Sequence, residues 1–432
     1  MVRSALAAVD RRGCAPICGV SGTSGQKFPK SEGPVPIAAE MARCRPSSCR
    51  STLRGVTLSL EEHLKFRLLA NGVRVHPDAA STWRDIYGGP LTLAEYATTS
   101  GVTLRLPRDL YVNAPITNSA ETPELRVEEA AFFLSDEGVE VPLQVIPVPA
   151  FHGQCYEEDG SIRALTDLGV THTDRCRVSP IAGCSWACSF CDLPFEHKYR
   201  RKAPEQLLRL IQIAQNDRLA PARHVLVSGG TPGRQHESWI DDVYRFLARE
   251  SPLPVDIMMP PREDLGYPEW LRSAGINSLS INLEVFDMHR AREITPNKAR
   301  RFTRSHFLDY IERAVESFGV GNVQSLLVFG SAIEPVESTL AGLRELVERG
   351  CVPVLSMFRP HPSTPLSQAP AATLEEIETT YLQGLEICEA VGNGVLLGPR
   401  CIPCQHNTVT LPIDGEFYLA DSDEYGRPCL TS

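Results

Sequence analysis

The feature that most restricts the fold of this sequence is a regular alternation of strand-like and helix-like segments between residues 173 and 400. Short apolar runs predict six strands, at residues 177–181, 224–228, 255–259, 278–283, 324–329 and 352–358. Helix-like segments lie between and after them, at residues 204–216, 238–249, 307–318, 336–349 and 374–390. Such repetition predicts a parallel sheet with helical crossovers. We therefore expect an α/β fold, a partial (β/α)6 TIM-like barrel, with its chemistry in loops at the carboxyl ends of the strands.

Three further regions flank the predicted barrel at 173–400. Residues 1–54 are rich in Ser, Pro, Gly and Arg without a sustained apolar period, which predicts a disordered head. Residues 55–172 predict a small α+β lead-in region, with a helix near 58–71 and strands such as 102–106 and 139–148. Residues 401–432 form a C-terminal extension.

Charge and cysteine content narrow the class of partner. The formal net charge is -10, whereas proteins that grip nucleic acid usually present a basic face, so a small-molecule substrate is expected and nucleic acid is not. No apolar run has the length needed to span a bilayer, so no membrane partner is expected. Fourteen clustered cysteines in a chain of 432 residues favour metal chemistry over disulfides, which indicates a reducing, cytoplasmic compartment.

A cysteine-rich loop follows the first predicted strand of the barrel. Cys184, Cys188 and Cys191 have the spacing C-x3-C-x2-C, for which random scatter of the cysteines gives roughly 0.015 occurrences. Three thiolates on a short loop can hold three irons of a [4Fe–4S] cluster and leave the fourth iron open. A zinc site is the alternative, with His197 as the nearest fourth ligand, although zinc usually takes four ligands.

This loop resembles the signature of the radical S-adenosylmethionine (SAM) superfamily, including an aromatic residue, Phe190, before the last cysteine. The resemblance covers roughly residues 173–368. It implies a [4Fe–4S] cluster on the three cysteines and SAM on the open iron, reductively cleaved to a 5′-deoxyadenosyl radical. That radical would abstract hydrogen from a small biosynthetic substrate, with an electron donor such as flavodoxin or ferredoxin as the partner.

Other strand-end loops are similar to SAM-binding stretches of that superfamily. Gly229 and Gly230 match a Gly-Gly motif that contacts the methionine amino group, and Thr231 stands where the family often has Glu. Glu284 is similar to the ribose-binding acid of biotin synthase-like members, and Arg304 to the arginine that binds the SAM carboxylate. A solvated strand-end Glu and a basic surface turn remain the alternatives for these two residues.

The last predicted strands and the extension carry further candidates. Gly330 resembles the family's glycine-then-acid pattern below the adenine, and His361 lies in a loop similar to the biotin synthase-like branch, where it would line the substrate cavity. An exposed histidine on a Pro-rigidified loop is the alternative. Cys401 and Cys404 predict a possible second metal site with His406 as a third ligand; two reduced thiols in a turn, or a redox pair, are the alternatives.

Two other functions compete with a radical SAM enzyme acting on a small molecule. The first is a non-catalytic zinc or iron–sulfur binding protein, which would have no need of the Gly229-Gly230 pair, Glu284 or Gly330. The second is radical SAM modification of a peptide or RNA. The acidic body of the chain weighs against RNA.

Overall fold

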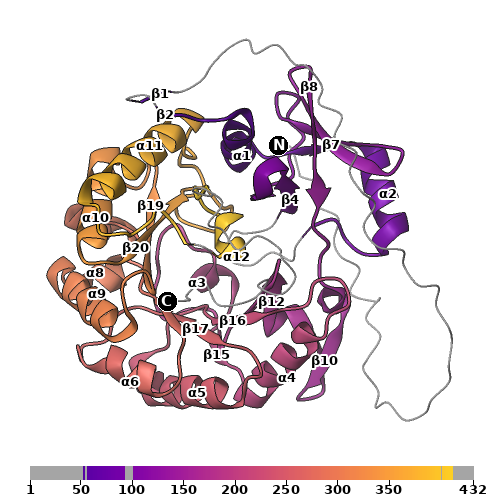
Figure 1. Cartoon of the computed structure of the whole chain (residues 1–432). Coiled ribbons are helices and arrows are strands. Elements are labelled where there is room, and N and C mark those ends of the chain that lie inside the picture. Colours follow the sequence, from indigo (N-terminus) through magenta and orange to yellow (C-terminus); the bar gives the residue numbers. More distant parts are fainter. Residues whose placement is uncertain (1–51, 54–55, 93–100, 400, 412–432) are drawn as a thin grey trace.

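A curved, seven-stranded sheet forms the centre of the computed structural model, which describes residues 52–53, 56–92, 101–399 and 401–411 (Figure 1). Strands β13 to β20 of this sheet are parallel, and only β12 runs antiparallel to its neighbour. The order is β12 (Gly169–His172), β13 (Arg175–Val178), β16 (His224–Val227), β17 (Val255–Met258), β18 (Ser278–Ser280), β19 (Val323–Phe329) and β20 (Val352–Met357). The predicted partial TIM-like barrel is confirmed.

Helices lie along the outer, convex side of this sheet (Figure 1). They are α4 (Pro204–Gln215), α5 (Glu237–Glu250), α6 (Tyr267–Ser273), α9 (Arg304–Phe318), α10 (Val336–Glu348) and α11 (Leu374–Val391). In α4 the apolar residues recur at helical spacing, so Leu207, Leu210 and Ile211 are all buried on one face. Helix α11 begins with a capping box, in which the side chains of Thr373 and Glu376 each accept a hydrogen bond from the backbone amide of the other residue. This arrangement favours the start of a helix here, because two amides of the first turn would otherwise have no partner.

The first barrel strand differs from the prediction of 177–181. Observed β13 ends at Val178, and Ile181–Ala182 instead form β14, which pairs with β15 (Arg200–Arg201). Pro180 separates the two strands and has no amide hydrogen to continue the ladder. Strand β12 was not predicted: it pairs antiparallel with β13, so the barrel sheet extends across the predicted boundary at residue 172.

The lead-in region is mixed α+β, as predicted. Helix α1 (Leu60–Asn71) packs on α11, with the rings of Phe66 and Tyr381 5.2 Å apart. The remaining elements are α2 (Pro77–Tyr87), β3 (Arg74–Val75), β4 (Val102–Leu106), β5 (Leu110–Ala114), β6 (Glu124–Glu128), β7 (Ala131–Asp136), β8 (Val139–Pro142), β9 (Gln144–Val145), β10 (Cys155–Glu158) and β11 (Ser161–Ala164). Most of the predicted head lies outside the described residues; its described part, β1 (Thr52–Leu53), pairs antiparallel with β2 (Val56–Thr57) of the lead-in region.

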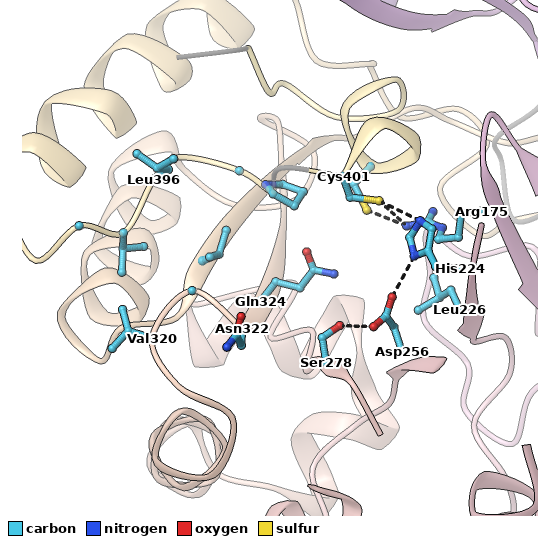
Figure 2. A pocket seen from close by; sticks show the side chains of 17 residues that line it. Arg175, His224, Leu226, Asp256, Ser278, Val320, Asn322, Gln324, Leu396 and Cys401 are labelled. Carbon is cyan, nitrogen blue, oxygen red and sulfur yellow. Dashed lines mark hydrogen bonds and ion pairs between the residues drawn. The ribbon is translucent and has the colours of Figure 1, made fainter. Parts of the chain in front are cut away.

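Alternate side chains of the strands line two cavities inside the barrel. At the amino ends of the strands, Arg175, His224, Asp256 and Ser278 border a cavity of about 290 Å³ (Figure 2). Further along, a second cavity of about 250 Å³ reaches the loops at the carboxyl ends. In the part of the chain that the structure describes, no helix is long and apolar enough to cross a membrane.

Candidate active site

The cysteine-rich loop lies between β14 and the short helix α3 (Leu193–Glu196), at the carboxyl end of β13. Its three thiols are half-buried. The Cys184 sulfur accepts hydrogen bonds from the backbone amides of Trp186, at 3.3 Å, and Thr231, at 3.2 Å. Burial raises the pKa of Cys188 well above its usual range and that of Cys191 to about 12. As free thiols these two groups are therefore protonated, and metal binding has to release their protons.

The loop containing Gly229 and Gly230 packs directly against the cysteine-rich loop. Gly229 has a positive φ of 122°. A Cβ atom added to Gly230 would lie 1.7 Å from the Gly183 carbonyl oxygen, so the two backbones touch at a distance that only glycine allows. The Ser185 backbone amide donates a hydrogen bond to the Thr231 carbonyl at 3.0 Å, so a backbone hydrogen bond also joins the two loops. The structure thus brings two predicted motifs into contact.

Glu284 is also held near the cysteines, by a residue that the sequence analysis missed. Lys298, from α8 (Pro296–Arg301), donates to the Glu284 carboxylate at 2.6 Å and to the Asn282 carbonyl at 3.0 Å. The charges of Glu284 and Lys298 act on the Cys188 thiol with opposite sign, Glu284 raising its pKa and Lys298 lowering it. Lys298 is buried, yet in the sequence it lies beside two arginines, Arg300 and Arg301, and carries no distinguishing signal.

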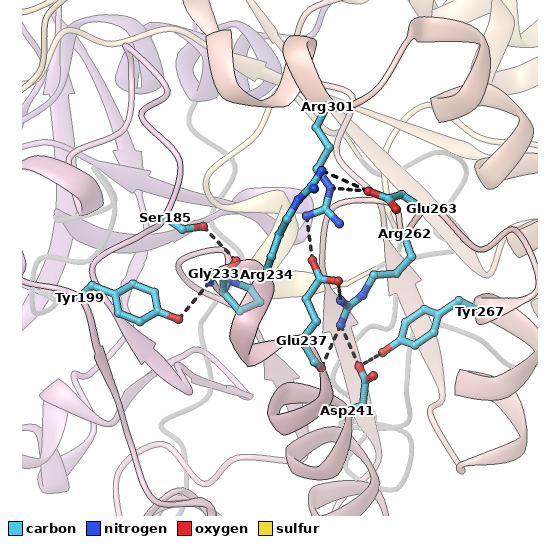
Figure 3. A network of polar contacts seen from close by, with 11 residues as sticks. Ser185, Tyr199, Gly233, Arg234, Glu237, Asp241, Arg262, Glu263, Tyr267 and Arg301 are labelled. Carbon is cyan, nitrogen blue, oxygen red and sulfur yellow. Dashed lines mark hydrogen bonds and ion pairs between the residues drawn. The ribbon is translucent and has the colours of Figure 1, made fainter.

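Arg304 begins α9, and its guanidinium lies over the ring of Phe286 at 4.6 Å from the centroid. Its neighbour Arg301 belongs to a polar network on the same side of the barrel (Figure 3). Arg301 contacts Glu237 at 2.7 Å and Glu263 at 3.4 Å. Because Glu237 is the first residue of α5, the network ties that helix to α8.

Gly330 and the acid that follows it hold two strand-end loops in place. Gly330 has a φ of 133°, a conformation that favours glycine. The Glu334 side chain is fully buried and accepts hydrogen bonds from the backbone amides of Phe286 and Asp287, the latter at 2.8 Å. The Thr339 hydroxyl donates to it at 3.1 Å. The carboxylate therefore fixes the loop after β18 relative to the loop after β19.

His361 lies in the loop after β20. Its Nδ1 is 2.8 Å from the Ser363 hydroxyl and 3.9 Å from a carboxylate oxygen of Glu196. Two described residues near His361, Phe358 and Arg359, line the 250 Å³ cavity, but His361 itself is not among the described residues that line it. A catalytic role for His361 stays a prediction.

The 250 Å³ cavity connects the cysteine-rich loop with the barrel interior. Cys191 and Asp192 border it at one end, and three arginines, Arg175, Arg177 and Arg359, line its wall. Its apolar lining comprises Phe190, Met258, Leu326, Val328, Val354, Met357, Phe358 and Pro403. A chamber next to the cysteines thus combines apolar surface with an excess of positive charge.

The pair Cys401 and Cys404 lies at the other end of the strands, beside Arg175 and His224. His406 is buried, with its ring centroid 5.3 Å from that of His172. Among the residues that the structure describes, no three His, Cys, Asp or Glu side chains are gathered to hold a single metal ion. The second metal site stays a prediction.

Comparison with known proteins identifies the domain that carries these loops. Residues 178–343 match the family model of the radical SAM superfamily. These residues form a radical SAM domain. The radical SAM domain so matched contains all three cysteines of the loop and strands β16 to β19. Membership in the biotin synthase-like branch stays a prediction.

The individual relatives of this chain are distant. The bacteriochlorophyllide c C-7(1)-hydroxylase of Chlorobaculum limnaeum is 27% identical over 111 residues, which cover 26% of this chain and 27% of that protein. The hydrogenase maturase HydG of Carboxydothermus hydrogenoformans is 14% identical, with 54% of this chain and 55% of that one covered and a TM-score of 0.40. Coproporphyrinogen III oxidase of Escherichia coli is 16% identical, with 57% and 59% covered and a TM-score of 0.38. The chain thus spans about a quarter to three fifths of these relatives' lengths.

The superfamily implies a [4Fe–4S] cluster and SAM as cofactors, and the cysteine-rich loop fits the cluster. It presents three half-buried thiols from one short loop. Two backbone amides point at the Cys184 sulfur, a kind of contact that tunes iron–sulfur clusters. Cys184, Cys188 and Cys191 are the residues that would hold the cluster.

Proposed function

We propose that this chain is a radical SAM enzyme that acts on a small molecule bound inside the barrel. The bound cluster and SAM would supply a 5′-deoxyadenosyl radical by reductive cleavage, and the radical would abstract hydrogen from the substrate. The observation that carries the proposal is the position of the cysteine-rich loop, because Cys191 borders the 250 Å³ cavity. A reactive species formed at this loop would be next to a chamber that can hold a small substrate.

The walls of the chamber favour an anionic substrate with an apolar body. The lining of the chamber includes three arginines, Arg175, Arg177 and Arg359, and one carboxylate, Asp192. A guanidinium pairs well with a carboxylate or phosphate through two hydrogen bonds. Because burial lowers the pKa of Arg359 only to about 10, this group is still charged at neutral pH. Arginines at this depth would orient the substrate by its acidic group.

Removal of single cysteines tests the activity. Anaerobically reconstituted wild-type protein should bind about four irons at the loop and form 5′-deoxyadenosine from SAM and dithionite. Cys184→Ala, Cys188→Ala and Cys191→Ala should each abolish that product. Cys388→Ala is the matched control, because Cys388 is a buried thiol on the distant helix α11. Unaltered 5′-deoxyadenosine formation in any of the three variants would contradict the proposal.

An acidic electron donor such as flavodoxin or ferredoxin is the partner that the surface beside the cluster loop favours. Ser185 and Trp186 border a cleft of about 360 Å³ whose rim carries Arg234, Arg300 and Arg301. Positive charge there would steer an acidic protein towards the cluster. Arg300→Glu should slow reduction by flavodoxin but leave reduction by dithionite unchanged. Equal loss with both reductants would refute docking at this cleft.

A cytoplasmic location remains part of this proposal, since the cluster needs reduced thiols.

A further inference from the structure

A second reactive arrangement lies at the amino ends of the barrel strands, away from the cysteine-rich loop. Arg175, His224 and Asp256 occupy the starts of three adjacent strands, and Cys401 lies beside them (Figure 2). Cys404, from the same segment as Cys401, lines the same cavity. In TIM-like barrels this end usually serves stability, and chemistry is found at the other. A thiol pair, an imidazole and a carboxylate around one 290 Å³ cavity therefore need another explanation.

The first part of the arrangement is a relay of thiol, imidazole and carboxylate. The Cys401 sulfur lies 3.7 Å from Nε2 of His224, and Nδ1 of His224 lies 3.0 Å from an oxygen of Asp256. Asp256 accepts hydrogen bonds in turn from the Ser278 hydroxyl at 2.7 Å and from the side-chain Nδ2 of Asn277 at 2.8 Å. Because Asp256 accepts the Nδ1 proton, Nε2 is free to take a proton from Cys401. This order of groups is the one that activates a nucleophile.

The second part is the neighbouring thiol. Cys401 caps the one-turn helix α12 (Ile402–Gln405), and the Cys404 amide donates to the Cys401 carbonyl at 3.0 Å. The C-x2-C segment is therefore folded into one turn with both thiols on the same cavity. Nη1 of Arg175 is 2.7 Å from the Cys404 sulfur and 3.7 Å from the Cys401 sulfur. The guanidinium can stabilise negative charge on either sulfur.

The position of His224 gives the two thiols different roles, because its imidazole lies beside Cys401, which is therefore the thiol that can pass its proton to a base. A hydrogen bond to Cys401 and burial raise the pKa of Cys404 well above its usual range, although the charge of Arg175 lowers it. Burial disfavours a charged His224, but the hydrogen bond to Asp256 and the charge of Asp174, 3.9 Å away, outweigh it and raise the pKa of His224. A protonated His224 beside Cys401 favours the Cys401 thiolate.

We propose that Cys401 and Cys404 are a redox-active dithiol that exchanges with a disulfide substrate, independently of SAM cleavage. The Cys401 thiolate attacks a disulfide RSSR, forms a mixed disulfide and expels a thiolate, which takes the proton of His224 and leaves as RSH. The Cys404 thiol then attacks the Cys401 sulfur and its proton leaves with the second RSH. The balance is one RSSR reduced to two RSH and two cysteines oxidised to one disulfide.

This dithiol is placed to affect the substrate chamber. Arg175 and Cys404 line both the 290 Å³ cavity and the 250 Å³ cavity that Cys191 borders. Forming the disulfide removes the thiol that Arg175 contacts, and so changes the wall that the two cavities share.

The test uses the full-length, reconstituted protein and oxidised glutathione as the disulfide. After timed exposure and alkylation, peptide mass spectrometry should show a Cys401–Cys404 disulfide at pH 7, formed at least tenfold faster than modification of Cys388. Cys388 is the internal control, since burial raises its pKa to about 12. His224→Gln and Asp256→Asn should each slow formation tenfold or more, in line with the loss of a positioned base.

A pH profile separates this role from a structural one. The His224→Gln rate should recover towards the wild-type rate at pH 9, because the thiolate then forms without a base; a variant that is merely unfolded or distorted would not recover in this way. Cys401 reacting no faster than Cys388 would overturn the proposal. Iron or zinc retained by a Cys184→Ala, Cys188→Ala, Cys191→Ala triple variant and lost with Cys401→Ala would also overturn it, because the pair would then be a metal site.

Discussion

Replacement of Gly230 by alanine should disrupt the cluster loop from a residue that carries no functional group. The added Cβ would lie 1.7 Å from the Gly183 carbonyl oxygen and 2.9 Å from Cα of Cys184. Both of these atoms are backbone, so no side-chain rotation can relieve the clash. Real Cβ atoms essentially never come closer than 3.0 Å to a neighbour, so the two loops must separate by about 1.3 Å.

The size of the effect follows from that displacement. Overpacking a close contact costs about 1–3 kcal/mol, and a backbone clash belongs at the upper end, so the free energy of unfolding should fall by about 3 kcal/mol. The same movement breaks the 3.2 Å hydrogen bond from the Thr231 amide to the Cys184 sulfur. A displacement of about 1 Å in a reactive site can cost about 100-fold in rate. We therefore expect reduced iron content and a loss of 5′-deoxyadenosine formation of that order.

The assay combines urea unfolding, iron content after anaerobic reconstitution and the rate of 5′-deoxyadenosine formation. Gly233→Ala is the matched control: it lies in the same loop, but the three atoms nearest to its added Cβ all belong to the side chain of Gln235, which can rotate away. Gly233→Ala should resemble the wild type in all three measurements. If Gly230→Ala binds a full cluster with unchanged stability, the close approach of the two loops is not a requirement of the site.

The remaining predictions concern SAM binding and stability. Glu284→Ala and Arg304→Ala should each weaken SAM binding about tenfold while the cluster assembles, as expected for a lost hydrogen bond to a charged group; wild-type affinity by calorimetry in both would refute their assignment to SAM. Lys298→Met should lower the free energy of unfolding by about 3 kcal/mol, because Glu284 loses its partner 2.6 Å away, and Lys298→Arg should recover part of that free energy. An unchanged free energy of unfolding in Lys298→Met would contradict a stabilising buried ion pair. Burial lowers the pKa of His152 to about 4 and that of His406 to about 3. The unfolded chain, with histidines near 6.5, then binds more protons, so stability falls as pH drops below 6.5, by up to about 1.4 kcal/mol per pH unit for each histidine. His152→Gln should make this slope shallower in urea titrations, and an unchanged slope would contradict the assignment.

Local patterns in the sequence determined most of the barrel. Periodic apolar residues predicted helix α11 at 374–390, and the structure has it at Leu374–Val391. Parallel strands are buried on both faces, so they are visible in the sequence as continuous apolar runs. The strand predicted from such a run at 324–329 corresponds to β19, Val323–Phe329. The spacing of Cys184, Cys188 and Cys191 is also a local pattern, because three ligands of one cluster can lie together on a short loop, and it predicted the cysteine-rich loop as the cluster site.

Tertiary structure alone decided which distant residues meet. The pairing of β12 with β13 depends on a tight turn at Thr173, which has a φ of 53°, and not on any apolar period. Lys298 is distinguished from its neighbouring arginines only by where α8 packs. Cys401 and His224 are 177 positions apart in sequence and adjacent in space because the chain crosses the amino ends of the strands after α11. Such contacts arise from the packing of whole elements, so no window of sequence contains both partners.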